Sequence, residues 1–461
     1  MTSKSSYNIS ERKVLLRIVD VILLILSLLV ATIYLDFSYI SFQSEFITGW
    51  FLILTFYYLL FGEIFQLYNL KVSNNRYTVV RSVTLTAFFT TIFYIFTPYL
   101  TPVLPSNRMQ IVYFFIILSL PIILWRFIYM WLIFSPKYFK NIILIGKSDN
   151  IKKLINKIEK DNIHNLDSYL SDKEIEGIGS FNNISNVKIS SLINTSISEV
   201  IVSLKDLSNE VVESLNKELV LLFQQGVNIV SYETFYEEIN LRVPREYLKN
   251  NFYKHLNFSK NNSNRFYLFG LRFIDIIFSV LGLIIFVGLT PLLLIGNLFA
   301  NRGPLFYSQE RVGQSGRNFR IFKLRSMVKN AESDGAVWAV KNDVRITSFG
   351  KFLRHTRLDE FPQFYNILKG DMSIIGPRPE RPERPEFVHD LEKKIPFYAI
   401  RNVVRPGLTG WAQVNFPYAA SIEEQEKKLR YDLYYIKERS LFLDFKILIK
   451  TISTVLFMKG Q

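Results

Sequence analysis

The first third of the chain contains four apolar segments, each close to the length of a membrane-spanning helix. They cover residues 14–35, 47–67, 83–100 and 111–134. A helix that crosses the hydrocarbon core of a bilayer needs about 20 predominantly apolar residues. The sequence therefore predicts a membrane protein whose residues 1–137 form a four-helix transmembrane region. We expect structural roles, with side chains reaching toward the helix ends, for four ionisable residues: Arg17, Asp20, Glu63 and Arg126.

Basic residues set the expected orientation of these helices. They lie before the first segment, between the second and third, and after the fourth: Lys4, Arg12, Lys13, Lys71, Arg76, Arg81, Lys137 and Lys140. The other two connections, residues 36–46 and 101–110, contain a single basic residue, Arg108. Because Lys and Arg concentrate in cytoplasmic loops, the three basic stretches are predicted to be cytoplasmic.

Composition narrows the chemistry that is open to the rest of the chain. There is no Cys, so disulfides and thiolate metal sites are excluded, and with four His a metal ion is expected on oxygen ligands. The net charge of +15 indicates an anionic partner, which is a phospholipid surface, a nucleic acid or a phosphorylated substrate.

A fifth apolar segment, residues 276–300, has basic residues on both sides: Lys254, Lys260, Arg265, Arg272, Arg302, Arg311, Arg317 and Arg320. Both of its ends are therefore expected in the cytoplasm. A segment that enters and leaves on one side must turn inside the bilayer, and Thr290 with Pro291 supplies the break. The sequence predicts a re-entrant helical hairpin over residues 272–300. The alternative is a full span that is only kinked at Pro291.

Residues 138–247 alternate short apolar runs with a helical pattern, which predicts a small Rossmann-like α/β domain. Its first turn has Gly146 alone where a dinucleotide fingerprint has three glycines, so we expect a structural or regulatory spacer and no cofactor. Residues 248–264 are interpreted as a linker to a second region, 265–461. Within it, residues 428–457 are amphipathic and either lie on the membrane or pack on their own domain.

Two adjacent carboxylates, Asp359 and Glu360, stand among arginines before an apolar helical pattern. Pro362 fits the first turn of that helix, which places both acids at or just before its N-terminus. Such a position stabilises carboxylates and attracts phosphate, so an ionised Asp359 is a candidate nucleophile. For the pair alone, a simple role as capping residues remains the alternative.

Basic residues recur beside turns in the same region: Lys323, Arg325, Arg354, Arg357, Arg378 and Arg405. Taken singly, each of these residues is typical of a solvent-exposed cation on a protein surface. Brought together by the fold, they would clamp a diphosphate, because guanidinium groups bind its oxygens in pairs. An acidic residue that coordinates Mg2+ would complete the requirements of phosphoryl transfer.

The blocks "FKLRSM", "GKFLRHTRLDEFPQFYNILKGDMSIIGPRP" and "RPGLTGWAQV", preceded by "RFIDIIFSV", resemble the bacterial sugar transferase family. Its members are monotopic polyprenyl-phosphate sugar-1-phosphate transferases. The resemblance covers about residue 266 to the C-terminus, and the four preceding spans and α/β domain are similar to the long subclass. The fold it implies is a membrane α-helical bundle, a Rossmann-like α/β domain, and a mainly α, membrane-associated catalytic domain with a re-entrant helix.

The resemblance implies transfer of a sugar 1-phosphate from a UDP-sugar to undecaprenyl phosphate, which releases UMP and initiates exopolysaccharide or O-antigen synthesis. Asp359 matches the nucleophile that forms a phosphosugar aspartate, and Glu360 matches the Mg2+ ligand. Basic positions that hold phosphate groups or the nucleotide are matched by Lys323, Arg354, Arg378 and Arg405. The rival interpretations are a non-catalytic membrane scaffold for polysaccharide assembly and a nucleic-acid binder, and the latter is not expected.

The expected location is the bacterial inner membrane, multi-pass, with the catalytic domain on the cytoplasmic face and in contact with membrane lipids. The sequence does not identify the sugar that is transferred. It also does not give the oligomeric state, and a homo-oligomer is one of the alternatives. One departure from the family pattern is visible: this chain reads "GPRPERPERPEF", as though Arg-Pro-Glu were repeated.

Overall fold

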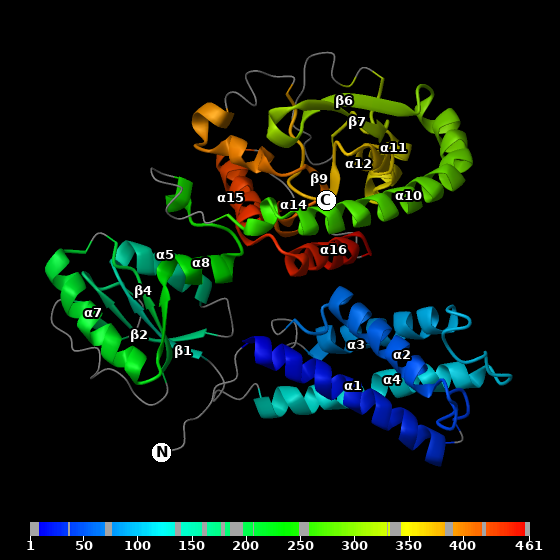
Figure 1. Ribbon diagram of the computed structural model, residues 1–461, viewed down its shortest axis with the longest axis horizontal. Helices are drawn as coiled ribbons and strands as arrows, with labels where there is room; N and C mark the ends of the chain where they lie inside the picture. Colours follow the sequence, from blue (N-terminus) through cyan, green and yellow to red (C-terminus); the bar gives the residue numbers. More distant parts are fainter. Residues whose placement is uncertain are drawn as a thin grey trace. The chain divides into compact units, whose positions relative to one another are not determined.

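The computed structural model divides the chain into two compact units, Met1–Phe235 and Tyr236–Gln461, which Figure 1 colours from blue to red along the sequence. The residues that it describes are 9–35, 37–69, 76–133, 140–158, 164–176, 180–184, 197–205, 207–248, 258–329, 331, 343–382, 391–416 and 421–456. Most of the predicted linker lies outside this set, as do Glu383 and Arg384 of the repeated Arg-Pro-Glu.

The first unit begins with four long apolar helices: α1 (Ile9–Tyr34), α2 (Ile47–Ile64), α3 (Arg76–Ile95) and α4 (Met109–Ile133). All four are long and apolar enough to cross a membrane. Their shared core is rich in aromatic and aliphatic side chains, including Leu28, Tyr58 and Phe114. α3 begins seven residues before its predicted start and ends before Pro98, because a proline disfavours helical conformation in the residue that precedes it.

The four ionisable residues singled out in the sequence form two pairs across the bundle. Arg126 of α4 donates a hydrogen bond to Asp20 of α1, and both side chains are buried. Arg17 forms an ion pair with Glu63 of α2. The prediction of a structural role fits these contacts, but for Asp20 and Arg126 the expected reach toward the helix ends is wrong: they neutralise each other inside the bundle.

The rest of the first unit is a parallel five-stranded sheet in the order β3-β2-β1-β4-β5. Its strands are β1 (Lys140–Ile145), β2 (His164–Ser171), β3 (Phe181–Asn183), β4 (Ile197–Val202) and β5 (Asn228–Ser231), with helices α5 (Ser148–Ile158) and α7 (Asn209–Gln224). Helix α8 (Tyr232–Asn240) begins in this unit and ends in the second. The predicted α/β character is confirmed. β2 and β3 were not predicted, since their sequences "HNLDSYLS" and "FNN" lack the apolar runs of the other strands.

The turn after β1 is filled by groups of this chain. The amide of Ser148, at the start of α5, donates to the Asp172 carboxylate at 2.8 Å. A Cβ atom on Gly146 would lie 2.9 Å from Cβ of Ser203. The Asp172 carboxylate therefore caps the N-terminus of α5.

The second unit is built on one long helix, α10 (Arg265–Gly296), which continues as a π-helical turn, η5 (Asn297–Asn301). An antiparallel hairpin follows, β6 (Phe306–Val312) and β7 (Asn318–Leu324). Next come α11 (Ser348–His355), the single turn η7 (Leu358–Glu360), α12 (Gln363–Lys369) and β8 (Ser373–Ile375), which pairs in parallel with β9 (Gly407–Thr409). The short helices η3 (Arg245–Leu248), η4 (Lys260–Asn262), η6 (Gln314–Gly316), η8 (Tyr398–Val403) and α14 (Trp411–Asn415), with α15 (Ile422–Glu438) and α16 (Leu441–Leu456), complete the unit.

The predicted hairpin break at Thr290 and Pro291 is not present, because α10 runs through both residues without interruption. Proline removes only one backbone N–H, and Thr290 Oγ1 bonds back to the carbonyl of Phe286 at 2.8 Å. Figure 1 shows α10 as one helix that curves at the right of the second unit. The feature expected as two helical arms is therefore a single bent helix.

One stripe of α10 packs against the second unit along its whole length. Its buried residues are Tyr267, Leu271, Asp275, Ser279, Gly282, Phe286 and Leu293. Near the start, Tyr267 donates to Asp444 of α16, and Asp275 accepts from the amide of Ile374 at 2.8 Å. At the end, a Cβ atom on Gly296 would lie 2.5 Å from the ring of Phe349 of α11. Both ends of α10 therefore contact the same compact body.

Gly282 of α10 packs directly against the Phe364 ring of α12. A Cβ atom there would lie 2.5 Å from the ring of Phe364. We expect Gly282→Ala to destabilise the protein by about 1–3 kcal/mol, the usual cost of overpacking. Thermal unfolding in detergent measures it. Gly288→Ala on the same helix is the matched control, since a Cβ there meets nothing within 4 Å, and an equal loss in both variants would contradict this packing.

Candidate functional site

Three segments of the second unit bring their charged side chains together. β7 contributes Lys323, the turn between α11 and α12 contributes Asp359 and Glu360, and the segment after β8 contributes Arg378. Hydrogen bonds hold these segments in register: the Asn366 amide group donates to the Arg320 carbonyl at 2.7 Å and accepts from the Phe322 amide at 3.1 Å. Asn366 of α12 thus fixes β7 beside the turn that carries the two acids.

The acids lie in a tight turn that opens with a strained residue. Arg357 has a positive φ of 61°, a conformation that non-glycine residues adopt rarely. The single turn Leu358–Glu360 follows, and α12 begins at Gln363 after Pro362. The predicted location just before a proline-started helix is confirmed. The side chain of Asp359 is directed inward, with 8% of the residue exposed.

Glu360 is held by two cations. Its Oε1 atom accepts from Arg378 Nη2 at 2.9 Å and lies 3.3 Å from Lys323 Nζ. Burial raises the pKa of Glu360, but the charges of Arg378, Lys323 and Arg357 outweigh burial, and the net pKa lies well below the usual range. Glu360 is therefore ionised throughout the neutral pH range.

Asp359 differs from its neighbour because its buried Oδ1 atom has no hydrogen-bond partner in the part of the chain that the structure describes. Burial, with the charge of Glu360 adding to it, raises the pKa of Asp359 to about 6, against the opposing charges of Lys323, Arg354 and Arg357. A buried carboxylate that is ionised at neutral pH and lacks a partner is poorly solvated. Such an oxygen is free to attack an electrophile.

The other predicted cations have different places. Arg354 donates to the Ser326 hydroxyl at 2.9 Å and acts on Asp359 through its charge. Arg325 donates to the carbonyl of Asn301 at 2.9 Å, so it anchors the end of α10. The charge of Arg405 acts on Asp275 of α10. Lys323 and Arg378 thus contact Glu360 of the carboxylate pair directly, and the charge of Arg357 acts on both acids.

Sequence reasoning missed a second set of charges behind Arg378. It consists of Arg311, Glu380, Arg401, Lys428 and Asp432. Arg401 donates to Glu380 Oε1 at 2.7 Å and to the Arg378 carbonyl at 3.0 Å. The repeated Arg-Pro-Glu marks this stretch in the sequence, but the partners on η8 and α15 carry no local signal.

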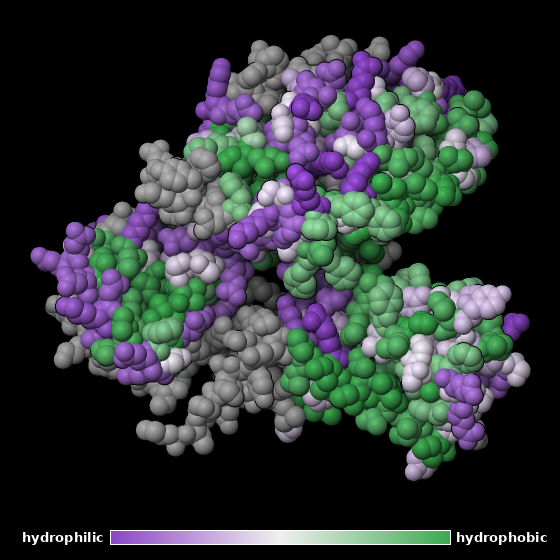
Figure 2. Space-filling view, in the orientation of Figure 1, coloured by the Kyte–Doolittle hydropathy of each residue, from purple (hydrophilic) through white to green (hydrophobic). Residues whose placement is uncertain are grey.

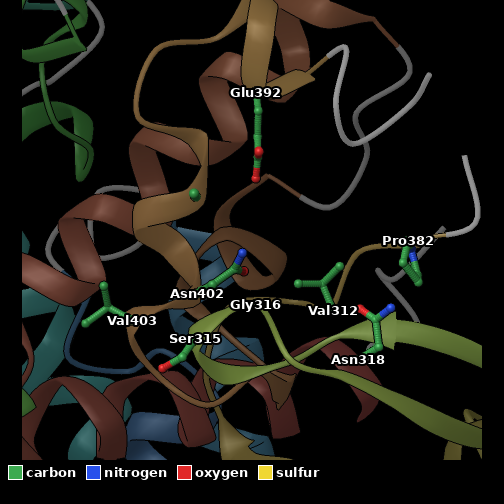
Figure 3. Close-up of a pocket in the computed structure, with 9 residues that line it drawn as sticks. Val312, Ser315, Gly316, Asn318, Pro382, Glu392, Asn402 and Val403 are labelled. Atoms are coloured by element: carbon green, nitrogen blue, oxygen red, sulfur yellow. The ribbon is translucent and has the colours of Figure 1, made fainter. Parts of the chain in front are cut away.

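A cavity of about 540 Å³ lies at the turn of the β6–β7 hairpin, away from the carboxylate pair. Figure 3 shows side chains that surround it, with Glu392 and Asn402 reaching in from different sides. Its lining is Val312, Ser315, Gly316, Asn318, Pro382, Glu392, Ala399, Asn402 and Val403. None of the predicted site residues belongs to this lining, although Arg378 and Pro382 lie on the same short segment.

A largely buried acid pair beside cations that can neutralise phosphate has the groups that a phosphoryl-transfer site requires. The long apolar helix α10 of the same unit is typical of a membrane-associated protein. The chain belongs to the bacterial sugar transferase family, whose sequence model matches residues 266–458.

Several curated proteins are similar to the second unit. An N-acetylgalactosaminephosphotransferase of Aeromonas hydrophila, which by its name uses UDP-N-acetylgalactosamine and undecaprenyl phosphate, is 46% identical over 193 residues, 41% of this chain and 44% of that protein. A UDP-glucose:undecaprenyl-phosphate glucose-1-phosphate transferase of Xanthomonas campestris pv. campestris is 43% identical over 39% of this chain and 38% of that protein. An uncharacterised sugar transferase of Bacillus subtilis is 39% identical over 34% of this chain and 72% of that protein. The chain thus matches less than half the length of the first two relatives.

Proposed function

We propose that this protein transfers a sugar 1-phosphate from a UDP-sugar to undecaprenyl phosphate, with Asp359 as the nucleophile. The observation that carries the proposal is the buried, unpartnered Oδ1 atom of Asp359 beside an ion pair of Glu360 with Arg378 and Lys323. Two relatives bear names that describe this reaction with different sugars, so the donor sugar is left open.

The proposed reaction has two displacements at one phosphorus atom. Asp359 attacks the β-phosphorus of the UDP-sugar, the bond from this phosphorus to the bridging oxygen breaks, and UMP leaves. A phosphate oxygen of undecaprenyl phosphate then attacks the same phosphorus, and the bond to Asp359 breaks. The product is undecaprenyl diphosphate sugar, the carboxylate is regenerated, and the bond between sugar and phosphate stays intact.

The cations stabilise the charge that develops in both steps. Arg378 and Lys323 already lie beside Glu360, where their charges would also act on the oxygens of a bound diphosphate. Burial lowers the pKa of Lys323, and the charges of Arg378 and Arg311 lower it further. The charges of Glu360 and Asp359 raise it, but the net shift is downward. A poorly hydrated cation of this kind gains from contact with a phosphate.

The acid pair fits a magnesium ion. Mg2+ in phosphoryl-transfer sites is held by one or two carboxylates, and water and substrate phosphates complete its shell. Glu360 provides such a carboxylate, and we propose that it would hold the ion. When bound, the ion would neutralise charge on the diphosphate.

The surface of α10 supports a membrane position for this site. The side of α10 and η5 that is not packed on the rest of the second unit exposes large apolar residues: Phe266, Phe269, Phe273, Ile284, Val287 and Leu292 of α10, and Leu298 and Phe299 of η5. Figure 2 shows apolar side chains gathered over the bend of α10. A crossing orientation would pull the packed elements beside it, including α12 and the acid turn, into the hydrocarbon core.

We therefore propose that α10 enters and leaves the inner membrane from the cytoplasmic side, with the site near the lipid headgroups. α16 fits the same surface: it packs on its domain through Leu443 and Ile447 and exposes Leu441, Phe442 and Phe445 outward. Of the two alternatives considered for this stretch, packing on its own domain is what the inner face of α16 shows, and we propose that its exposed outer face lies against lipid.

Cysteine labelling tests the one-sided position of α10, because the natural chain has no cysteine. We expect Lys260→Cys and Arg317→Cys, on either side of α10, to be protected from a membrane-impermeant maleimide in cells with an intact inner membrane. Val103→Cys, in the expected outer loop, is the positive control. Labelling of Arg317→Cys with protection of Lys260→Cys would show that α10 crosses.

A donor screen tests the activity itself. The full-length protein in liposomes with undecaprenyl phosphate and Mg2+ is expected to release UMP from at least one of UDP-N-acetylgalactosamine, UDP-glucose and UDP-galactose, and chelation of Mg2+ should stop release. No release from any UDP-sugar, in a preparation that is folded by thermal melting, would favour the rival function of a non-catalytic scaffold.

A further inference from the structure

The segment that carries Arg378 has no helix or strand of its own, yet its backbone carbonyls are held one after another. The carbonyl of Pro377 accepts from the Gly407 amide at 2.9 Å, and that of Glu380 accepts from the Val312 amide at 2.8 Å. Between them, the carbonyl of Arg378 accepts from Arg401 at 3.0 Å and that of Pro379 from Arg311 at 3.4 Å. Two of these four bonds therefore come from arginine side chains.

Arg401 is the centre of this arrangement. Its Nη1 atom donates to Glu380 at 2.7 Å and to the Tyr398 hydroxyl at 2.8 Å, and its Nη2 atom lies 2.8 Å from Asp432 of α15. Lys428 of α15 donates to the same Glu380 oxygen at 2.7 Å. Arg401 and Asp432 are buried, with side-chain exposures of 2% and 1%.

This set of two cations and two anions, of which Arg401 and Asp432 are buried and Glu380 and Lys428 are partly exposed, is poorly explained by its contribution to stability alone. The free energy lost when such charges leave water is about as large as the free energy gained from their mutual attraction. Apolar side chains of similar volume often stabilise a fold equally well. What the set does achieve is geometric, since Arg401 joins α15 and η8 to both the Arg378 carbonyl and the Glu380 side chain.

We propose that Arg401 is a positioning residue, which fixes the Arg378 backbone so that the Arg378 guanidinium stays beside Glu360 and faces the donor diphosphate. The Arg378 side chain is 38% exposed and bonds to Glu360 at 2.9 Å. A side chain with that much freedom keeps its place only if its backbone is held. The inference rests on the proposed phosphosugar transfer for its kinetic consequences, but not for its structural ones.

A double-mutant cycle in the full-length protein in liposomes tests the kinetic consequence. We expect Arg401→Gln to lower kcat/KM for the UDP-sugar at least tenfold, mainly through a higher KM. In an Arg378→Ala background, Arg401→Gln should lower kcat/KM by less than about twofold, because Arg401 acts through Arg378. Equal losses in both backgrounds would overturn the proposal. The control is Lys437→Met on α15, which removes the Lys437–Glu237 ion pair at 2.7 Å and should leave KM unchanged.

Hydrogen exchange tests the structural consequence without any activity. The Val312 amide reports on the segment because it donates to the Glu380 carbonyl. Arg401→Gln is expected to speed exchange of this amide at least fivefold, and unchanged exchange would contradict the proposal. If Arg401→Gln does not accumulate folded, Glu380→Gln takes its place in both measurements with the same expectations. A wild-type protein that releases no UMP would refute the proposed function, whereas the exchange result would still decide this inference.

Discussion

Replacing Asp359 by asparagine is expected to lower the rate of UMP release by at least about 1,000-fold, the order of loss seen when a covalent nucleophile is removed. Asparagine preserves the volume of the side chain but cannot form a stable phosphosugar ester. The measurement is a steady-state UMP assay in liposomes with the active donor. Asp371→Asn is the matched control: Asp371 pairs with Lys369 at 3.0 Å at the other end of α12, and its replacement should change the rate less than about twofold. Full activity of Asp359→Asn would remove the basis of the proposed mechanism.

The same variant should not be less stable than the natural protein at neutral pH. The raised pKa of Asp359 means that its ionisation opposes folding, and this cost appears as pH rises from about 4 to about 6. Asp359→Asn removes the cost, so at pH 7.5 we expect a gain on the order of 1–3 kcal/mol. Thermal melting in detergent measures this change, and it separates a lost nucleophile from a lost fold.

The pH dependence of catalysis follows from the same group. Attack requires the ionised form of Asp359, whose pKa is raised to about 6 by burial and by the charge of Glu360. kcat/KM should therefore be constant above pH 7 and fall about tenfold for each pH unit below 6. Glu360 does not add a second ionisation to the profile in this pH range, because its own pKa lies well below the usual range for a glutamate.

The pH profile is measured as kcat/KM with the donor varied, since this ratio reports on the free enzyme. Arg354→Gln provides a directed check, because Arg354 lowers the pKa of Asp359 through its charge. In that variant the midpoint should move to higher pH. A profile that stays flat to pH 4.5 in the natural protein would show that Asp359 is not the ionising group.

The turn that carries Asp359 and Glu360, and the elements beside it, could largely be predicted from the sequence. Pro362 marks the start of α12, so the position of Asp359 and Glu360 before a helix could be predicted from local rules. The apolar length of α10 and the strand pattern around β1, β4 and β5 are likewise local signals. Lys323 and Arg378 could be proposed as neighbours of the acids only through the resemblance to a family, because pairing across the fold leaves no local trace.

What could not be predicted depends on contacts between distant segments. Arg401 lies 23 residues from Arg378, and Lys428 lies 48 residues from Glu380, so neither looks different from an ordinary surface cation in the sequence. Arg325 stands in the same block as Lys323, yet it bonds to Asn301. α10 continues through Pro291 where a break was expected, because Phe286 before the proline and Leu293 after it both pack in one apolar cluster of the second unit.

The covalent adduct is the most direct measurement of the central claim. The protein is incubated with the active UDP-sugar and Mg2+ but without undecaprenyl phosphate, quenched, digested with trypsin and analysed by mass spectrometry. We predict a phosphosugar on the peptide that follows Arg357 and ends at Lys369, localised to Asp359 and removed by later addition of undecaprenyl phosphate. UMP release with no adduct, or an adduct on any other residue, would contradict this account.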